Sequence, residues 1–268
     1  MPKTEVYIPE HAVKTPDLAM AIVAHQDDAE IMFASYIVDA YFDKIISFSA
    51  VVLTDGKGSA RSGEYKNFAD DEMKEVRKKE QKAAADIGRY ESLFLLDFSS
   101  AELKKNPAAA AFEIKKILLE KRPKIVLLHN PFDKHPTHAA CLKASLLALL
   151  EIKDEYSPKQ AVAGEAWRGL DWLPEKYKLA KGGKRGFRLQ RRLLAAFESQ
   201  IAGGKRYDLA AEGRRRANAT FGESHSVDDF PEVSLFLDLT KVVKGEIPLQ
   251  SFVREVLEEF SKDVMKNL

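Results

Sequence analysis

Two short segments of this chain bring together residue types that bind divalent metals. The first, Ala24-His25-Gln26-Asp27-Asp28, holds one imidazole and two carboxylates, which are common zinc ligands. His25 and Asp28 lie three residues apart, so a helical first turn would aim both the same way. Asp27 would then face elsewhere and be free to act as a base. The alternative is that the acidic residues only cap a helix, where negative charge is favourable, although capping does not require the histidine.

The second segment, residues 129–138 with the sequence HNPFDKHPTH, holds three of the six histidines of the chain: His129, His135 and His138. The spacing of His135 and His138 across a helix start would direct both to one point, and Pro136 suits a first helical turn. A lone histidine in such a loop is more often structural, but two histidine-bearing loops at one sheet edge favour a metal site. Two histidines and one carboxylate with an open fourth position are typical of catalytic zinc.

The elements around these segments place both at one edge of a sheet. Apolar runs predict strands, and helical patterns follow them; the strands span 18–24, 45–53, 92–96 and 125–128, and the helices 30–42, 71–87, 107–120 and 136–150. Each histidine segment follows a strand and precedes a helix. Ligands of open parallel sheets bind beyond the carboxyl ends of the strands. The expected fold class is α/β, a Rossmann-like three-layer sandwich with a mainly parallel sheet.

The pattern is less regular in the second half of the chain. We expect strands over 160–166 and 233–239 and helices over 189–201, 208–219 and 249–265. The basic, glycine-containing stretch 176–192 is expected to be a loop that leads into the helix from 189. Its basic residues, with Arg214 to Arg216, could recognise a phosphate or another anionic group, although such a run is usually solvated surface. The expected organisation is a single domain over residues 1–268, with a core over 15–150 and a C-terminal α/β extension on the substrate side over 151–268.

The two metal-binding segments resemble the motifs of the PIG-L-like, or LmbE-related, metal-dependent N-deacetylases. The family's A-H-P-D-D motif corresponds to residues 24–28, and its H-P-D-H motif corresponds to residues 135–138. Thr54-Asp55-Gly56 and the helix RKKEQKAAADIG, residues 77–88, also look like family segments in the right order. The resemblance covers roughly the first 150 residues.

This resemblance implies a hydrolase that removes an N-acetyl group from an amino sugar or glycoconjugate. The residues it assigns to the metal are His25, Asp28 and His138. The metal would be zinc, with another divalent ion such as Fe²⁺ as the alternative. Asp27 would be the general base, and His135 would stabilise the oxyanion or protonate the leaving amine.

Two positions depart from the family motifs. Gln26 stands in place of the usual proline, and we expect it to loosen the backbone. Thr137 stands in place of the usual aspartate, and we expect the loss of a group that orients a metal ligand.

Four further residues are candidates for substrate binding. Arg77 is one of them, and the alternative is that it belongs to a solvated, charged helix. Trp167 and Arg168 could form a wall against a sugar ring, or instead serve core or interface packing. His225 is the remaining late histidine, and it could reach the site from the C-terminal part of the chain.

Composition narrows the classes of function. The net charge of +1 gives no field that would favour nucleic acid, and no apolar run approaches the roughly 20 residues that span a bilayer. The single cysteine, Cys141, suits a reducing compartment. We therefore expect a soluble cytoplasmic enzyme, and a homo-oligomer would be compatible with this expectation. The alternatives are a zinc amidase acting on a thiol conjugate or antibiotic-like amide, and a non-catalytic Rossmann-like binding protein. No G-x-G-x-x-G follows the first strand to support the latter.

Overall fold

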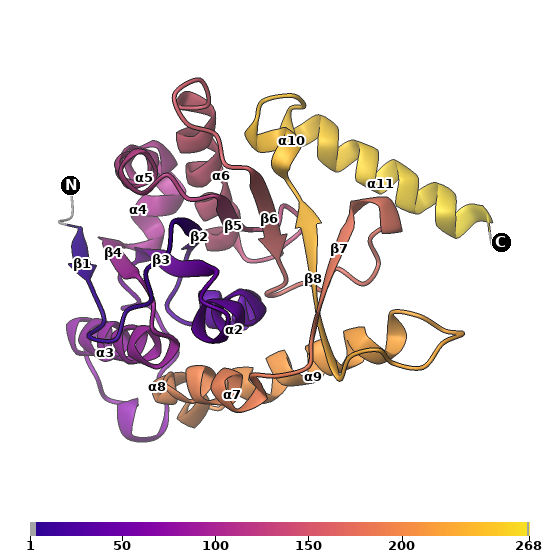
Figure 1. The fold of residues 1–268 in the computed structure, drawn as a ribbon. Coiled ribbons are helices and arrows are strands. Elements are labelled where there is room, and N and C mark those ends of the chain that lie inside the picture. The colour runs from indigo at the N-terminus through magenta and orange to yellow at the C-terminus, as the bar shows by residue number, and fades with distance from the viewer. Residues whose placement is uncertain (1–3, 267) are drawn as a thin grey trace.

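The computed structural model describes residues 4–266 and 268, and in this part of the chain eight strands form one sheet. The strands are β1 Glu5–Tyr7, β2 Asp17–Val23, β3 Ile46–Thr54, β4 Ser92–Phe98, β5 Ile125–His129, β6 Gln160–Gly164, β7 Lys178–Gly183 and β8 Glu232–Asp238. Their order is β1-β4-β3-β2-β5-β6-β8-β7 (Figure 1). Neighbours from β4 to β6 are parallel, whereas β1 pairs antiparallel with β4, and β8 pairs antiparallel with both β6 and β7.

Helices cover both faces of this sheet. One face packs against α4 Ser100–Lys105, α5 Pro107–Lys121, α6 Pro136–Glu151, α10 Thr240–Val243 and α11 Leu249–Lys266. The other face packs against α1 Asp28–Met32, α2 Ala34–Phe42, α3 Asp70–Gly88 and α7 Phe187–Ala195. The helices α8 Glu198–Ala202 and α9 Tyr207–Phe221 follow α7 along the same side (Figure 1). The expected three-layer, mainly parallel α/β fold is confirmed.

The central strand β2 shows why its sequence is apolar throughout. Side chains of a strand alternate between the two faces of a sheet. Met20 and Ile22 pack into the core under α5 and α6, whereas Ala21 and Val23 pack into the core under α1 and α2. A strand buried on both faces therefore has no polar face, and only its ends are free to carry chemistry.

The part of the chain after residue 150 joins the same sheet through β6, β8 and β7. Residues 176–192 were expected to form a loop, and this expectation is wrong, because residues 178–183 form the edge strand β7. Lys181 extends to Asp39 and Lys178 to Glu175, so lysines that suggested a loop occupy a sheet edge instead. At Gly182, an added Cβ would lie 2.3 Å from the ring of Phe230, so the glycine admits that ring rather than breaking the strand.

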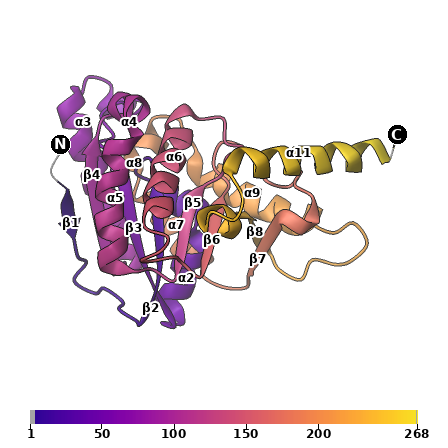
Figure 2. The ribbon, with the colours of Figure 1, turned by 90° about the horizontal axis from the view of Figure 1, so that it is seen from above.

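The helix expected over residues 30–42 is two helices, α1 and α2, separated at Phe33. The helix expected over 189–201 is likewise divided, into α7 and α8. The short elements β1 and α4, and the 3₁₀ turns at Gly63–Tyr65 and Glu175–Tyr177, were not expected. The last helix, α11, extends away from the sheet (Figure 2), with Phe252 and Val256 buried against the body. Among the described helices, none combines the length and the apolar character needed to cross a membrane.

Candidate functional site

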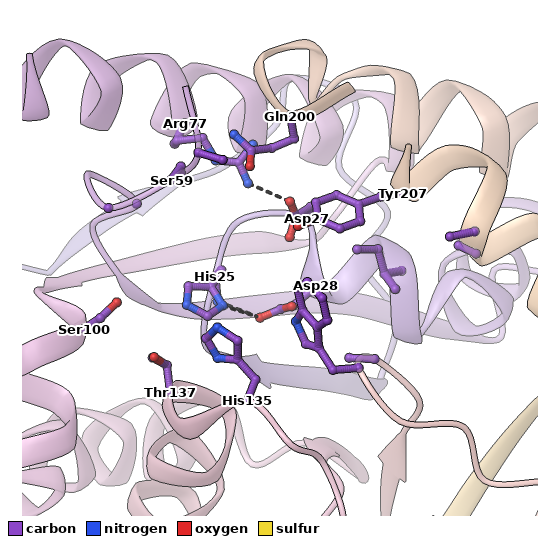
Figure 3. Close-up of a pocket in the computed structure, with 18 of the residues that line it drawn as sticks. His25, Asp27, Asp28, Ser59, Arg77, Ser100, His135, Thr137, Gln200 and Tyr207 are labelled. Carbon is purple, nitrogen blue, oxygen red and sulfur yellow. Dashed lines mark hydrogen bonds and ion pairs between the residues drawn. The ribbon is translucent and has the colours of Figure 1, made fainter. Parts of the chain in front are cut away.

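The two histidine-bearing segments meet because β2 and β5 are parallel neighbours in the sheet. Their register pairs Ala21 with Leu127, so both strands reach their carboxyl ends at the same edge. The chain then passes from β2 into α1 and from β5 into α6. Figure 3 shows the resulting group of side chains, with His25, Asp28 and His135 facing one another.

Donor atoms of three residues, His25, Asp28 and His138, form a triangle in which both oxygens of Asp28 take part. His25 Nδ1 lies 3.1 Å from His138 Nε2 and 3.3 Å from Asp28 Oδ2, and His138 Nε2 lies 3.3 Å from Asp28 Oδ1. Ligands about 2.0–2.1 Å from a tetrahedral zinc ion lie roughly 3.3–3.4 Å from one another. The residues present therefore fit a divalent metal, and two of them, His25 and Asp28, line the pocket.

Two more histidines lie close to this triangle, but they differ in what their nitrogens can do. His129 Nε2 accepts a hydrogen bond of 2.9 Å from the backbone N–H of Ala24, so this nitrogen is not free for a metal. Burial and the neighbouring His138 hold the pKa of His129 well below its ordinary value, so its 3.5 Å approach to Asp28 is not an ion pair. Its ring stacks on that of His138, with centroids 4.0 Å apart, and thereby supports the His138 imidazole.

His135 lies beside the triangle and lines the pocket. Its ring centroid is 4.6 Å from that of His138 and 5.0 Å from that of His25. Burial and the charge of His138 lower the pKa of His135 to about 4, so the imidazole is neutral at neutral pH. A neutral imidazole at this position can donate a hydrogen bond to a substrate oxygen.

Asp133 provides the orienting group that was expected to be lost with Thr137. His138 Nδ1 lies 3.1 Å from Asp133 Oδ2, an arrangement that leaves Nε2 free for a metal. The other oxygen of Asp133 accepts the backbone N–H of His135 at 2.8 Å. Although burial opposes it, Asp28 and Asp133 raise the pKa of His138 to about 10. The centre thus attracts positive charge, which a proton or a metal ion can supply.

Asp27 and Asp28 are adjacent in sequence but face different partners. Asp27 has φ 89°, in the left-handed region, where a residue other than glycine is uncommon. This turn directs Asp28 toward the histidines and Asp27 toward Arg77 (Figure 3). Burial raises the pKa of Asp27 to about 6, against the opposing charge of Arg77. Asp28 is also buried, yet His138 and His25 hold its pKa well below its ordinary value.

A buried network that sequence reasoning missed holds the backbone of Asp27 in this conformation. The N–H of Asp27 donates to Gln81 Oε1 at 3.2 Å, and Gln81 Nε2 donates to Glu30 Oε1 at 2.8 Å. Tyr90 donates its hydroxyl to the same oxygen at 2.6 Å. Burial raises the pKa of Glu30 to about 7. Strained backbone persists where surrounding contacts over-determine it, and here the contacts come from α3.

Gln26 does not loosen the backbone, contrary to expectation. It is buried, and its Nε2 donates to the carbonyl of Thr54 at 2.9 Å, which fastens the β2–α1 turn to the end of β3. Gly56 is required beside it, because its φ is +74° and an added Cβ would lie 2.5 Å from Gln26 Oε1. The family-like segment at residues 54–56 therefore supports the first motif directly.

Arg77 is not on a solvated face, because only 1% of its surface is exposed. Its Nη2 donates to Asp27 Oδ2 at 2.7 Å and to the carbonyl of Gln26 at 2.6 Å, and its Nη1 donates to Glu80 Oε2 at 2.6 Å. Glu80 in turn accepts the backbone N–H of Ser199 at 2.7 Å. Arg77 lines the pocket, but its hydrogen bonds position the Asp27 carboxylate and join it to α8.

A pocket of about 600 Å³ opens over these residues, within the range of small-molecule sites. Trp167 stands at its side, with its ring stacked on that of His135 at a centroid distance of 5.8 Å. Tyr207, the first residue of α9, reaches over Asp27 (Figure 3), and its ring meets that of Trp167 edge-on. Burial and the two aspartates raise the pKa of Tyr207 to about 12, so it remains a hydroxyl donor.

Two of the expected substrate-binding residues are not brought to this pocket. Arg168 is exposed and is not part of the pocket lining. His225 lies in the exposed segment between α9 and β8, where its backbone N–H donates to Glu223, and it also lies outside the lining. The lining instead includes four residues of α8 and α9 that the sequence did not indicate, Gln200, Tyr207, Ala210 and Ala211. It also includes Arg214, from the basic run Arg214 to Arg216.

Comparison with protein families identifies the core of the chain. Residues 20–149 match the PIG-L family model, described as GlcNAc-PI de-N-acetylase, which confirms the resemblance predicted from the two motifs. No curated protein matches the chain in sequence.

Solved structures share the fold at low sequence identity. The N,N'-diacetylchitobiose deacetylase from Pyrococcus horikoshii is 16% identical with a TM-score of 0.68, and the match covers 91% of each chain. The 4-carboxy-2-hydroxymuconate hydratase from Pseudomonas putida KT2440 is 15% identical with a TM-score of 0.64, covering 83% of this chain and 96% of that one. The zinc-inhibited form of teicoplanin deacetylase Orf2 is 16% identical with a TM-score of 0.58, covering 82% and 96%.

Proposed function

Because residues 20–149 match the PIG-L family model, we propose that the protein is a zinc-dependent N-deacetylase of an amino sugar or glycoconjugate. The observation that carries this proposal is the triangle of donor atoms from His25, Asp28 and His138, with a separate carboxylate, Asp27, buried beside it. Capping a helix would require neither the histidines nor the divergence of the two aspartates.

The metal would be held by His25 Nδ1, His138 Nε2 and the carboxylate of Asp28. When bound, a divalent metal supplies Lewis acidity toward the carbonyl oxygen of an amide and toward water. Asp133 keeps His138 in the required tautomer, and the stacked ring of His129 holds it in place. A donor set of nitrogen and oxygen atoms with an open position favours zinc, and also admits Fe²⁺.

The remaining steps belong to side chains of this pocket. Asp27 takes a proton from the attacking water as the water oxygen bonds to the amide carbon, since a base with a pKa near 6 is effective around neutral pH. Neutral His135 donates a hydrogen bond to the oxygen on which negative charge develops. The proton held by Asp27 then passes to the nitrogen as the carbon–nitrogen bond breaks, releasing acetate and the amine.

The fold alone does not decide between reactions, because the 4-carboxy-2-hydroxymuconate hydratase has the same fold. A different amide, as in a thiol conjugate or an antibiotic, is the other reading of the same centre. The aromatic wall formed by Trp167 and Tyr207 favours a ring-bearing substrate, since sugar rings stack on such faces.

The test is to measure metal content by mass spectrometry and amine release from N-acetylglucosamine derivatives, for the wild type and His138→Ala. We expect near-stoichiometric zinc and amine release in the wild type, and loss of both in the variant. Zinc without amine release from any N-acetylated sugar would reject the substrate class. A wild-type protein that binds no divalent metal would overturn the hydrolase proposal.

A further inference from the structure

Helix α9 brings an arginine, Arg214, to the pocket described above. It lies outside the matched residues 20–149, in α9. Four residues of α9 at helical spacing line the pocket: Tyr207, Ala210, Ala211 and Arg214. At 1.5 Å per residue, Arg214 lies about 10 Å along the helix from Tyr207, which reaches over Asp27. The pocket therefore runs from the reacting centre to a guanidinium group, past small side chains.

The guanidinium of Arg214 has a different environment from those of its neighbours. Arg215 approaches Glu232 at 3.3 Å, and Arg216 pairs with Glu212 at 2.7 Å. Arg214 donates from Nη1 to the carbonyl of Ala166, and no carboxylate of the described residues lies within ion-pairing distance of it. A half-buried arginine that keeps donors toward a pocket without a carboxylate partner can receive an anion from outside.

Glu165 is one compensating charge, since it interacts electrostatically with Arg214. Its two oxygens are occupied, however: Oε1 accepts the N–H of Leu170 at 2.7 Å, and Oε2 accepts Asn218 Nδ2 at 2.8 Å. Because Glu165 accepts these hydrogen bonds from other residues, the N–H donors of Arg214 stay available to a ligand.

The other charges in the pocket point to the same kind of ligand. Asp27 is engaged by Arg77, and Asp28 lies among the histidines. Besides Arg77 and Arg214, the lining contains one more cation, Lys104, which extends from an exposed position in α4. The charged groups of the pocket that the reaction does not use are thus positive.

We propose that Arg214 binds an anionic group of the substrate, a phosphate or a carboxylate, so that the substrate is an acidic N-acylated amino sugar. Arginine suits this role because its planar fork binds two oxygens of such a group at once. The proposal rests on the proposed function for the acylated amine, but the anion subsite can be measured without catalysis.

The test is calorimetric titration of the purified full-length protein with deacetylated sugars, which cannot be turned over. Glucosamine is compared with glucosamine 1-phosphate, glucosamine 6-phosphate and muramic acid, so that the phosphate and carboxylate arms are separate. We expect at least one acidic sugar to bind about 10- to 100-fold more tightly than glucosamine. Arg214→Gln should abolish that preference, and Arg214→Lys should keep part of it.

The control is Arg216→Gln, which removes a neighbouring positive charge of the same helix that pairs with Glu212 and does not line this pocket. It should leave the preference unchanged, and a thermal melt of each variant confirms folding. Equal affinity for neutral and acidic sugars in the wild type overturns the proposal. So does a preference that survives in Arg214→Gln, or one lost only in Lys104→Gln. Because no step requires deacetylation, failure of the proposed function would appear separately, as absent amine release.

Discussion

The floor and the roof of the pocket are built in opposite ways. The floor consists of residues 24–28 and 129–138, two loops that follow adjacent parallel strands. The roof consists of the helices α8 and α9, residues 198–221, which lie far along the chain and are joined by hydrogen bonds to residues beside the floor. Ser199 donates to Glu80, and Arg214 donates to the carbonyl of Ala166. In the proposed reaction the floor carries the groups for bond breaking, and the roof surrounds the rest of the substrate.

Under the proposed function, the floor residues control the reaction and the roof residues control selectivity for the substrate. Floor variants should change metal retention or turnover and leave discrimination between substrates largely intact. Roof variants should change binding and leave turnover at saturation nearly intact. The predictions below test that separation.

The largest expected effect is that of Asp27→Asn. Removing the base should lower kcat by about 10²- to 10⁴-fold while the metal remains bound, because Asp27 is not among the three converging donors. The measurement is steady-state amine release together with metal content. Asp28→Asn is the matched variant, since it alters the adjacent carboxylate and should lose the metal itself. Equal metal loss in both variants would show that the two aspartates are not divided as proposed.

An intermediate effect is expected for Asp133→Asn. The amide can still accept a hydrogen bond from His138 Nδ1 but no longer carries the charge that favours this orientation. Metal affinity should fall by about 10- to 100-fold, as measured by competition with a chelator. Asp154→Asn, at an exposed aspartate, is the control and should not alter affinity. Unchanged affinity in Asp133→Asn would assign the loop aspartate a purely structural role.

The smallest effect is expected for Trp167→Ala in the pocket wall. Loss of an aromatic face is worth about 0.5–1.5 kcal/mol, so KM should rise by roughly 2- to 12-fold with kcat changed less than that. Trp167→Phe should recover most of the affinity because it keeps a ring beside His135. A large fall in kcat with unchanged KM would instead place Trp167 with the floor, acting on His135.

The sequence was sufficient for most of the floor because its signals are local. The apolar run of β2 and the spacing of His25 and Asp28 predicted both the strand end and the pair of donors. The divergence of Asp27 from Asp28 was also expected, but the Gln81 and Glu30 contacts that hold it were not. Those contacts join residues more than fifty positions apart, and nothing in either segment alone indicates them.

Helices over 189–201 and 208–219 were expected and are present, but the residues that this half of the chain brings to the pocket were not, because their placement depends on distant partners. Lys178 and Lys181 suggested solvent, yet they belong to a strand because β8 provides a pairing partner. His225 was a reasonable candidate by residue type, but it lies on an exposed segment. Tyr207 belongs to no motif, and the basic run Arg214 to Arg216 does not show which of its arginines reaches the pocket. Only the packing of α9 over the sheet edge turns Tyr207 and Arg214 toward it.

The pairing of β7 with β8 has a consequence for how such a protein can diversify. Gly183 and Glu232 are opposite each other in the ladder, so the chain between them leaves the sheet and returns to nearly the same place. Long excursions between fixed, adjacent ends cost little additional closure entropy. Residues 184–231 can thus be lengthened, shortened or exchanged while the strands on either side keep their register. New substrate preferences can then arise from changes confined to this segment, while the residues proposed to carry out the reaction stay the same.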